Sequence, residues 1–287
     1  MKSKGYEPPG GLVELTPQGK VVRTSSADVA SIDNKRLLWP YSLTVLPEIN
    51  RVVSTSTEMG LPKWASPAHS SADHQHTSTD TSHIQIWSLK NLRLLATIPL
   101  PPSPNGNAQF NPAEPRVLPD GSLYVNTFSC GLYRVVGLAT SEPKAEFVHS
   151  FPGSGTNGEC GVPVVVGQYW IQTDTSLPGL IALDVSNPAK PIEVSRLVFD
   201  SRFEKPHWLA ADRRGNRVVV TGARGSWLLV VNVDSDTGKL ALDENFKAKG
   251  ADVSGVNFDR LQWPHGSTGK GVVHGALFGP TVVGKGP

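Results

Sequence analysis

Charged residues are scarce in this chain of 287 residues. Lysine, arginine, aspartate and glutamate together make up 18%, and the formal net charge is only +2. An average domain has about a quarter of its residues charged. A dedicated nucleic-acid or membrane-surface binder needs a concentrated basic face. The composition therefore argues against a nucleic-acid partner and against a membrane partner.

Cysteine is nearly absent as well. The chain has two cysteines, Cys130 and Cys160, and no Cys-x-x-Cys pair. Two cysteines can form one disulfide but no disulfide scaffold, so they leave the compartment open. The N-terminal sequence MKSKGYEPPGGLVEL lacks the apolar region of a signal peptide. We expect either a cytosolic protein or a chain from which the segment carrying the signal is missing.

Long apolar runs and several catalytic motifs are missing too. No apolar run reaches the length of about 18 residues that a membrane-spanning helix needs. The sequence contains no Gly-x-Ser-x-Gly elbow, no His-Glu-x-x-His and no phosphate- or dinucleotide-binding glycine motif between a strand and a helix. Gly153–Gly161 is glycine-rich, but no helical pattern follows it to bind a phosphate.

Glycine and proline are abundant, and short apolar segments alternate with turns. The chain has 28 glycines and 24 prolines, more than the average combined share of about 12%. Five hairpins of one kind recur, each an apolar strand, a polar turn and a second alternating strand. They cover Gly10–Ser25, His83–Leu100, Gly131–Phe151, Gly179–Phe199 and Ser226–Phe246.

A second kind of hairpin precedes most of the first kind. Its members begin with a very apolar strand and cover Tyr41–Ser56, Glu114–Phe128, Gly161–Asp174 and His207–Gly222. Two hairpins in series make a four-stranded meander, and such meanders repeated every 40–50 residues or so are typical of a β-propeller. The sequence thus predicts an all-β chain, a β-propeller of four-stranded antiparallel blades. A β-sandwich is the weaker alternative, and a parallel α/β fold is poorly supported because helical patterns are missing.

Five blade equivalents are visible, and we expect residues 1–287 to form a single propeller domain. The hairpin at Gly10 has no partner hairpin before it. Val273–Pro280 resembles an innermost strand with no hairpin after it. Either these two ends complete each other in one blade, or the chain lacks N-terminal blades.

The first strand of each blade lines the central channel of a propeller, so residues that begin these strands converge in space. Aligning the strands places Tyr41, Glu114, Cys160, His207 and His274 near the same level. The alignment is firmest for Tyr41 and His207, which both lie ten positions before an Arg-Val-Val sequence. For Glu114 and Cys160 the register is open by about one residue, and a slip of one residue turns a strand side chain to the other face.

Imidazole, carboxylate and thiolate groups are ligands of transition metals. The sequence therefore predicts a metal site at the channel mouth, with His207, His274 and Glu114 as ligands and His265 within reach from a nearby loop. Glu114, Cys160 and Tyr41 are the candidate catalytic or pocket-lining residues. Each also has a structural alternative: a hydrogen-bonded histidine, a buried cysteine, or a glutamate paired with Arg116.

A second histidine cluster, His69, His74, His76 and His83, lies in a Ser/Thr-rich stretch with Asp73 and Asp80. His74 and His76 are two residues apart and would share one face of a strand. The stretch has no apolar period, so a solvated surface loop is the favoured interpretation.

Short motifs along nearly the whole chain resemble the selenium-binding protein family, whose characterised members include methanethiol oxidases. They are PPGGLVEL (Pro8–Leu15), STSTEMGLP (Ser54–Pro62), EPR (Glu114–Arg116), LDVSNPAKP (Leu183–Pro191), VNVDSDTGKLALDENF (Val231–Phe246) and VVHGALFGP (Val272–Pro280). The resemblance implies a seven-bladed propeller and places Gly10 inside an early blade. It also implies copper as the cofactor, with His274 in the position of one proposed copper ligand and Glu114 in that of a carboxylate on the inner rim. His207 has no counterpart among those ligands, and the family's other site residues lie in a part that this chain would lack.

Three functions remain. The first is a copper-type, metal-dependent oxidoreductase acting on a small, thiol-like substrate, with histidines holding the ion and Glu114 as a ligand or proton acceptor. The second is a non-catalytic propeller that binds a ligand or protein partner. The third is a hydrolase or lyase that uses the same metal as a Lewis acid. The sequence leaves the substrate, the metal and the oligomeric state open.

Overall fold

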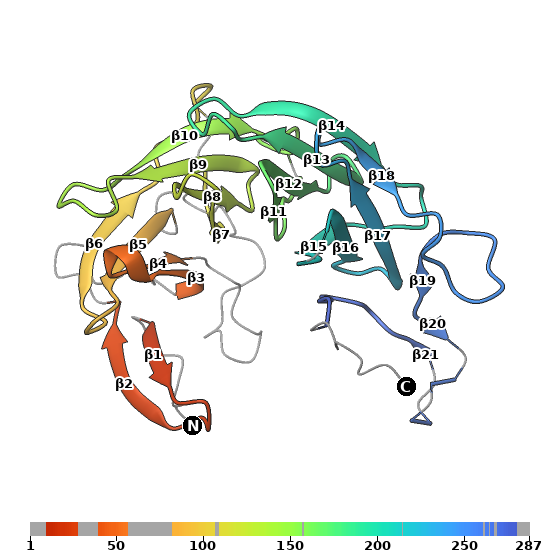
Figure 1. Ribbon diagram of the computed structural model, residues 1–287, viewed down its shortest axis with the longest axis horizontal. Coiled ribbons are helices and arrows are strands. Elements are labelled where there is room, and N and C mark those ends of the chain that lie inside the picture. The colour runs from red at the N-terminus through yellow and green to blue at the C-terminus, as the bar shows by residue number, and fades with distance from the viewer. Residues whose placement is uncertain are drawn as a thin grey trace, which may run out of the picture. The chain divides into compact units, whose positions relative to one another are not determined.

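The computed structural model describes residues 10–27, 40–56, 82–106, 109–156, 158–213, 215–260, 262–263, 265–266 and 269–279. The chain divides into two compact units, Met1–Asn157 and Gly158–Pro287. Over the described ranges the structure is almost entirely β, and its helical element is a 3-10 turn at Pro47–Ile49 (Figure 1). None of the helical turns in these ranges is long and apolar enough to cross a membrane.

The first unit begins with a two-stranded hairpin and continues with two four-stranded sheets. The hairpin pairs β1 (Gly11–Leu15) with β2 (Val21–Ser26). The next sheet has the order β3-β4-β5-β6, with strands at Pro40–Leu46, Arg51–Ser56, His83–Ser88 and Leu94–Pro99. The following sheet has the order β7-β8-β9-β10, with strands at Pro112–Val117, Leu123–Thr127, Gly131–Val136 and Lys144–Ser150.

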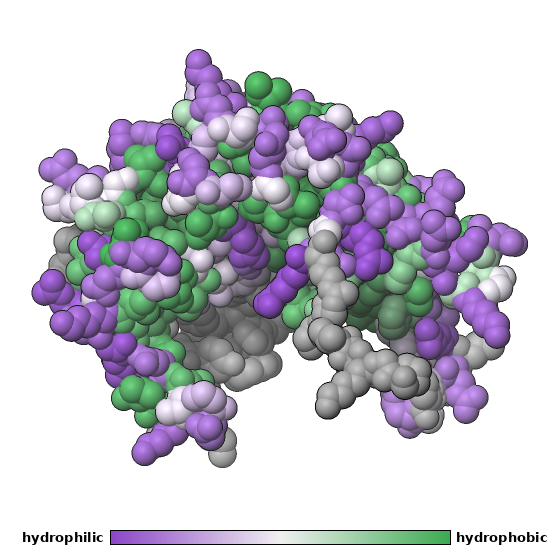
Figure 2. Space-filling view, viewed as in Figure 1, coloured by the Kyte–Doolittle hydropathy of each residue, from purple (hydrophilic) through white to green (hydrophobic). Residues whose placement is uncertain are grey.

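The two four-stranded sheets of this unit pack face to face through their second and third strands. Val53, Ile84, Ile86, Leu123, Val125 and Tyr133 form one buried cluster between them. Alternate residues of a strand point to opposite faces, and the second and third strands are nearly buried on both faces, which explains their continuous apolar runs. The β1–β2 hairpin is different: Val13, Leu15, Val21 and Val22 are more than half exposed. Figure 2 shows apolar surface among hydrophilic groups at the lower left, where this hairpin lies.

The second unit contains two further sheets of the same design. One has the order β11-β12-β13-β14, with strands at Val164–Val166, Tyr169–Asp174, Gly179–Asp184 and Ile192–Val198. The other has the order β15-β16-β17-β18, with strands at Pro206–Ala211, Arg217–Gly222, Trp227–Val233 and Leu240–Leu242, and β19 (Val256–Asn257) also pairs with β17. A small hairpin joins β20 (Asp259–Arg260) to β21 (Gly269–Lys270).

The predicted all-β fold and all nine predicted hairpins are confirmed, and every pairing between the named strands is antiparallel. The last predicted strand is wrong. Residues 273–279, the described part of Val273–Pro280, form no strand. A strand needs a neighbouring backbone ladder, and the described hydrogen bond to this segment comes from a side chain, Thr221. The prediction of one domain over 1–287 stays a prediction.

Candidate functional site

The inner strands β3, β7 and β15 start in the same way. Each begins at a proline, Pro40, Pro112 or Pro206, and in each the pairing register shifts just after it. Proline has no N–H to give to the ladder. An extra unpaired residue of this kind is a β-bulge, which redirects the neighbouring side chains. The residues predicted to line the rim in these three strands therefore lie at irregular strand starts.

A second shared feature fixes the equivalence between blades. The penultimate residue of the second strand accepts, through its side chain, a hydrogen bond from a backbone N–H near the start of the blade. The pairs are Ser42 N to Thr55 Oγ1 (3.3 Å), Glu114 N to Asn126 Oδ1 (3.1 Å) and Gly161 N to Thr173 Oγ1 (2.9 Å). Glu114 is thus equivalent to Ser42, one residue away from the predicted match with Tyr41. Cys160, directly before Gly161, keeps that match.

In the first unit, Glu114 forms the centre of a polar cluster. Its Oε2 atom accepts a hydrogen bond from the Ser42 hydroxyl (2.6 Å) and another from Arg116 Nη1 (2.8 Å). The Glu114 side chain is 11% exposed and that of Arg116 is 31% exposed. A carboxylate withdrawn from water needs such partners. The structural alternative considered for Glu114, an ion pair with Arg116, is therefore confirmed.

Tyr41 borders this cluster. Its ring meets that of Phe128 edge to face, with centroids 5.7 Å apart. Burial raises the pKa of Tyr41, and the nearby Glu114 carboxylate raises it further, while Arg116 lowers it. Tyr41 and Glu114, both predicted rim residues, thus lie within electrostatic range of each other. Because the phenol stays protonated, it is suited to donate a hydrogen bond rather than to act as a base.

In the second unit, His207 and His274 lie together. Their ring centroids are 4.8 Å apart and the ring planes are tilted by 45°. His207 is the second residue of β15 and is half-buried, whereas His274 is exposed and lies outside any strand. Residues separated by 67 positions in the sequence are thus in ring contact, as their shared place in the predicted alignment suggested. Their role as metal ligands remains a prediction.

Backbone contacts hold His207 in place. Its carbonyl accepts a hydrogen bond from Val162 N (2.7 Å). The neighbouring Gly161 allows this close approach, because a Cβ on Gly161 would collide with the His207 carbonyl oxygen. The first imidazole of the pair therefore stands on a rigid inner strand that is hydrogen-bonded to the preceding blade of the same unit.

The segment carrying His274 is held differently. Thr221, which corresponds to Thr55 and Thr173 in the other blades, donates its hydroxyl to the His274 carbonyl (2.9 Å). Gly275 lies against the ring of Trp208, and a Cβ there would come within 3.2 Å of the ring. Trp208 Nε1 is buried and has no hydrogen-bond partner among the described residues. An unpartnered donor therefore lies in the residue next to His207.

Cys160 is fully buried, as its structural alternative required. Cys130 and Cys160 are both disulfide-bonded, so neither offers a free thiolate in this structure. Within the second unit, Cys160 Sγ lies within 4.8 Å of an Asp174 carboxylate oxygen. Asp174 Oδ1 already accepts hydrogen bonds from the backbone N–H and the hydroxyl of Ser176. A catalytic or metal-binding role for Cys160 would require reduction of the disulfide.

His265 lies with aromatic neighbours. Its ring stacks on Trp263 at a centroid distance of 6.0 Å, and Trp263 donates its Nε1 hydrogen to the Gly269 carbonyl. Ring contacts described for His265 do not include His207 or His274, so the structure does not bring the third predicted histidine ligand into the pair. His69, His74, His76, Asp73 and Asp80 lie outside the described residues. His83 is described, and it is buried at the start of β5.

The sequence analysis did not predict three side chains that belong to the Glu114 cluster or lie beside the histidine pair. Ser42, Trp208 and Thr221 carry hydroxyl or indole donors beside the predicted residues. Ser42 and Trp208 each directly follow a predicted site residue. The sequence shows the leading prolines, but the bulges that place two consecutive side chains at the strand start come from the pairing registers.

No protein-family model matches the sequence, and no curated protein matches it. The solved structures give clear likenesses. A periplasmic gluconolactonase of Pseudomonas aeruginosa matches with a TM-score of 0.58 and 14% identity over 80% of this chain and 61% of its own. A hypothetical selenium-binding protein of Sulfolobus tokodaii matches with a TM-score of 0.53 and 16% identity over 72% of this chain and 54% of its own.

A third structure, a putative 6-phosphogluconolactonase of Bacteroides uniformis, matches with a TM-score of 0.57 and 10% identity over 81% of this chain and 63% of its own. This chain therefore spans between about half and two thirds of the length of these three proteins. Identities this low show the fold alone, and with the four-stranded antiparallel sheets they establish the β-propeller fold. The likenesses include a selenium-binding-type propeller, and membership of the methanethiol oxidase family is not shown.

Proposed function

We propose that this protein is a metal-dependent hydrolase that opens a small ester or lactone, with the ion held by His207 and His274. The observation that carries the proposal is the approach of the two imidazole rings to 4.8 Å. Imidazole binds zinc, copper, iron and nickel well. Two protein ligands leave coordination positions open for water and substrate.

The chain's own residues support this arrangement. His207 is fixed by the backbone bond from Val162, and His274 by the bond from Thr221 to its carbonyl. Trp208, next to His207, has a buried Nε1 donor with no hydrogen-bond partner among the described residues, which is unusual away from functional sites. When bound, the ion would polarise a carbonyl as a Lewis acid and lower the pKa of a coordinated water.

One observation favours testing hydrolysis before oxidation. Two of the similar solved structures are named as a gluconolactonase and a putative 6-phosphogluconolactonase. These share the fold with the chain, so they indicate which reaction to test first.

The second candidate is a copper-type oxidoreductase acting on a small thiol. Its support is the resemblance of the sequence motifs to the selenium-binding protein family and the similar structure named as a hypothetical selenium-binding protein. The same two histidines would hold the ion, so both candidates depend on the same residues and differ in the reaction.

The test combines metal analysis with two activity assays. We expect elemental analysis of the reconstituted protein to find about one transition metal ion per chain, and to find it lost in His207→Ala and in His274→Ala. His265→Ala is the matched control, because the ring contact of His265 is with Trp263. We expect δ-gluconolactone hydrolysis, followed by acid release, to disappear in the first two variants and persist in the third.

The possible results distinguish the hydrolase from the oxidoreductase. Absence of metal in the reconstituted wild type would reject both candidates. Metal without lactone hydrolysis, but with oxygen consumption driven by methanethiol or a similar thiol, would replace the hydrolase by the oxidoreductase. Loss of metal in His265→Ala would add a third ligand.

A further inference from the structure

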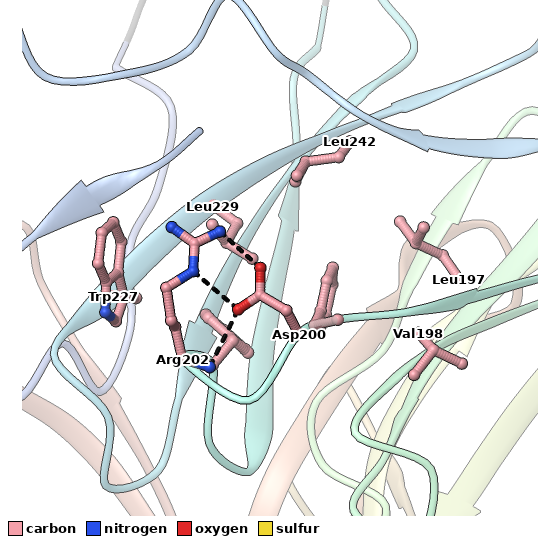
Figure 3. Close-up of a pocket in the computed structure, with 9 residues that line it drawn as sticks. Leu197, Val198, Asp200, Arg202, Trp227, Leu229 and Leu242 are labelled. Carbon is pink, nitrogen blue, oxygen red and sulfur yellow. Dashed lines mark hydrogen bonds and ion pairs between the residues drawn. The ribbon is translucent and has the colours of Figure 1, made fainter. Parts of the chain in front are cut away.

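A cavity lies at the outer strands of the second unit, away from the histidine pair. It has a volume of about 200 Å³, below the roughly 300–1,000 Å³ of pockets that bind drug-sized ligands. Its apolar wall comes from β14, β17, β18 and the segment after β14, shown in Figure 3. The wall residues are Leu197, Phe199, Phe203, Trp227, Leu229 and Leu242.

The floor of the cavity is preformed. Phe199, Phe203 and Leu229 are less than 8% exposed and belong to the main core cluster of the unit. The two phenylalanine rings meet edge to face, with centroids 4.9 Å apart. Close-packed side chains of this kind resist collapse. A small apolar group would therefore find an existing space and need not open one.

An ion pair borders this apolar space. Arg202 donates from Nε (2.8 Å) and Nη2 (2.5 Å) to the two carboxylate oxygens of Asp200, and its backbone N–H also donates to Asp200 (3.0 Å). The guanidinium lies over the Trp227 ring, 5.1 Å from its centroid. Figure 3 shows Asp200, Arg202 and Trp227 gathered at one side of the pocket.

The guanidinium retains hydrogen-bonding capacity. Arginine has five N–H donors, and no hydrogen bond of Arg202 Nη1 is present among the described residues. The stacking on Trp227 and the bonds to Asp200 hold the guanidinium in one orientation. A fixed guanidinium beside an apolar cavity matches a ligand with an apolar body and an anionic, planar acceptor head.

We propose that this cavity binds a small monocarboxylic acid with an aromatic or branched apolar body, and that Arg202 receives the carboxylate. The apolar body occupies the space over Phe199, Phe203 and Leu229. The Asp200 carboxylate competes with the ligand for the guanidinium, so it tunes the affinity downward. None of the lining residues is His207 or His274, and the proposal is independent of the hydrolase function.

Benzoate is the probe, with benzylamine and benzyl alcohol as matched compounds of similar size but different head groups. The protein is labelled with 5-fluorotryptophan, and Trp227→Phe identifies the fluorine signal of Trp227 among the seven tryptophans. We expect a saturable shift of that signal with benzoate. Binding of the other two compounds is expected to be about tenfold weaker, because the benzylamine cation is repelled by Arg202 and benzyl alcohol lacks an anionic carboxylate for the guanidinium.

Two variants are expected to change the affinity for benzoate in opposite directions. Arg202→Gln is expected to weaken benzoate binding about tenfold, through loss of a hydrogen bond to a charged group. Asp200→Asn is expected to strengthen it, because the guanidinium loses its competing carboxylate. Arg196→Gln and Glu193→Gln are the controls: that pair lies on β14 itself and has the same two-bond geometry, with both distances 2.8 Å, but does not line the cavity.

The proposal is overturned if benzoate produces no saturable shift of the Trp227 signal, or if benzylamine binds as tightly. It is also overturned if Arg202→Gln and Arg196→Gln change the affinity equally. All of these variants alter exposed ion pairs, so we expect them to fold, and the dispersion of the fluorine signals checks this directly.

Discussion

The polar groups at the blade starts of the two units meet their bonding needs in different ways. In the first unit, Glu114 is almost buried and is bound by Ser42 and Arg116. In the second unit, the rings of His207 and His274 are in contact with tilted planes, and His274 is exposed. A buried carboxylate must have partners within the protein, whereas the polar atoms of an exposed side chain can bind water. The starts of blades in a repeated fold thus carry a buried, hydrogen-bonded cluster in one unit and a contact between two imidazole rings in the other.

The largest expected effect comes from breaking the Glu114 cluster. Glu114→Ala should lower the free energy of unfolding by about 2–3 kcal/mol, because it leaves the Arg116 guanidinium without its carboxylate in a partly buried place. Urea unfolding measures this. Glu146→Ala removes the exposed partner of Lys144 and should cost less than about 1 kcal/mol. Equal losses in the two variants would show that the Glu114 cluster is not the structural element described here.

An intermediate effect concerns Tyr41 and alkaline pH. Because the pKa of Tyr41 is raised in the folded state, its contribution to stability is complete below the unfolded pKa of about 10 and decreases as the pH rises above it. Wild type should therefore lose more stability than Tyr41→Phe between pH 9 and pH 11.5. Urea unfolding at a series of pH values checks this, and parallel curves for the two proteins would contradict it.

The smallest effect on stability is expected for the histidine pair. In metal-free protein, His274→Ala should change the free energy of unfolding by no more than about 0.5 kcal/mol, because the side chain is exposed. Thermal or urea unfolding in the presence of a chelator measures this. A loss as large as that of Glu114→Ala would make the histidine pair a structural element too, and would remove the contrast between the units.

The fold was largely predictable from the sequence, since apolar strands and turn residues mark each hairpin. The periodicity placed all nine hairpins, from Gly10–Ser25 to Ser226–Phe246, close to their observed bounds. The segment at Val273 was not predictable in this way. Its apolar residues resemble a strand, yet strand formation depends on a backbone partner that local sequence does not specify.

The sequence predicted most residues of the candidate site, but it predicted their strand register and their contacts less well. The alignment of strand starts predicted that His207 and His274 lie near each other, and in the structure their rings are in contact. The position of Glu114 was off by one, because sequence spacing does not show where a β-bulge adds its residue. The pairing of Arg202 with Asp200 beside an apolar cavity had no sequence signal, since the cavity is assembled from several strands.

The sequence by itself determined the strand pattern of this protein and the chemical types at its blade starts, because alternation and turn chemistry act within a few residues. Tertiary structure alone decided which of these groups lie in contact with one another. That choice depends on contacts between residues far apart in the chain, such as Ser42 with Glu114 and His207 with His274. Contacts between segments that are distant in the sequence bring these residues together, and the local sequence does not encode such contacts.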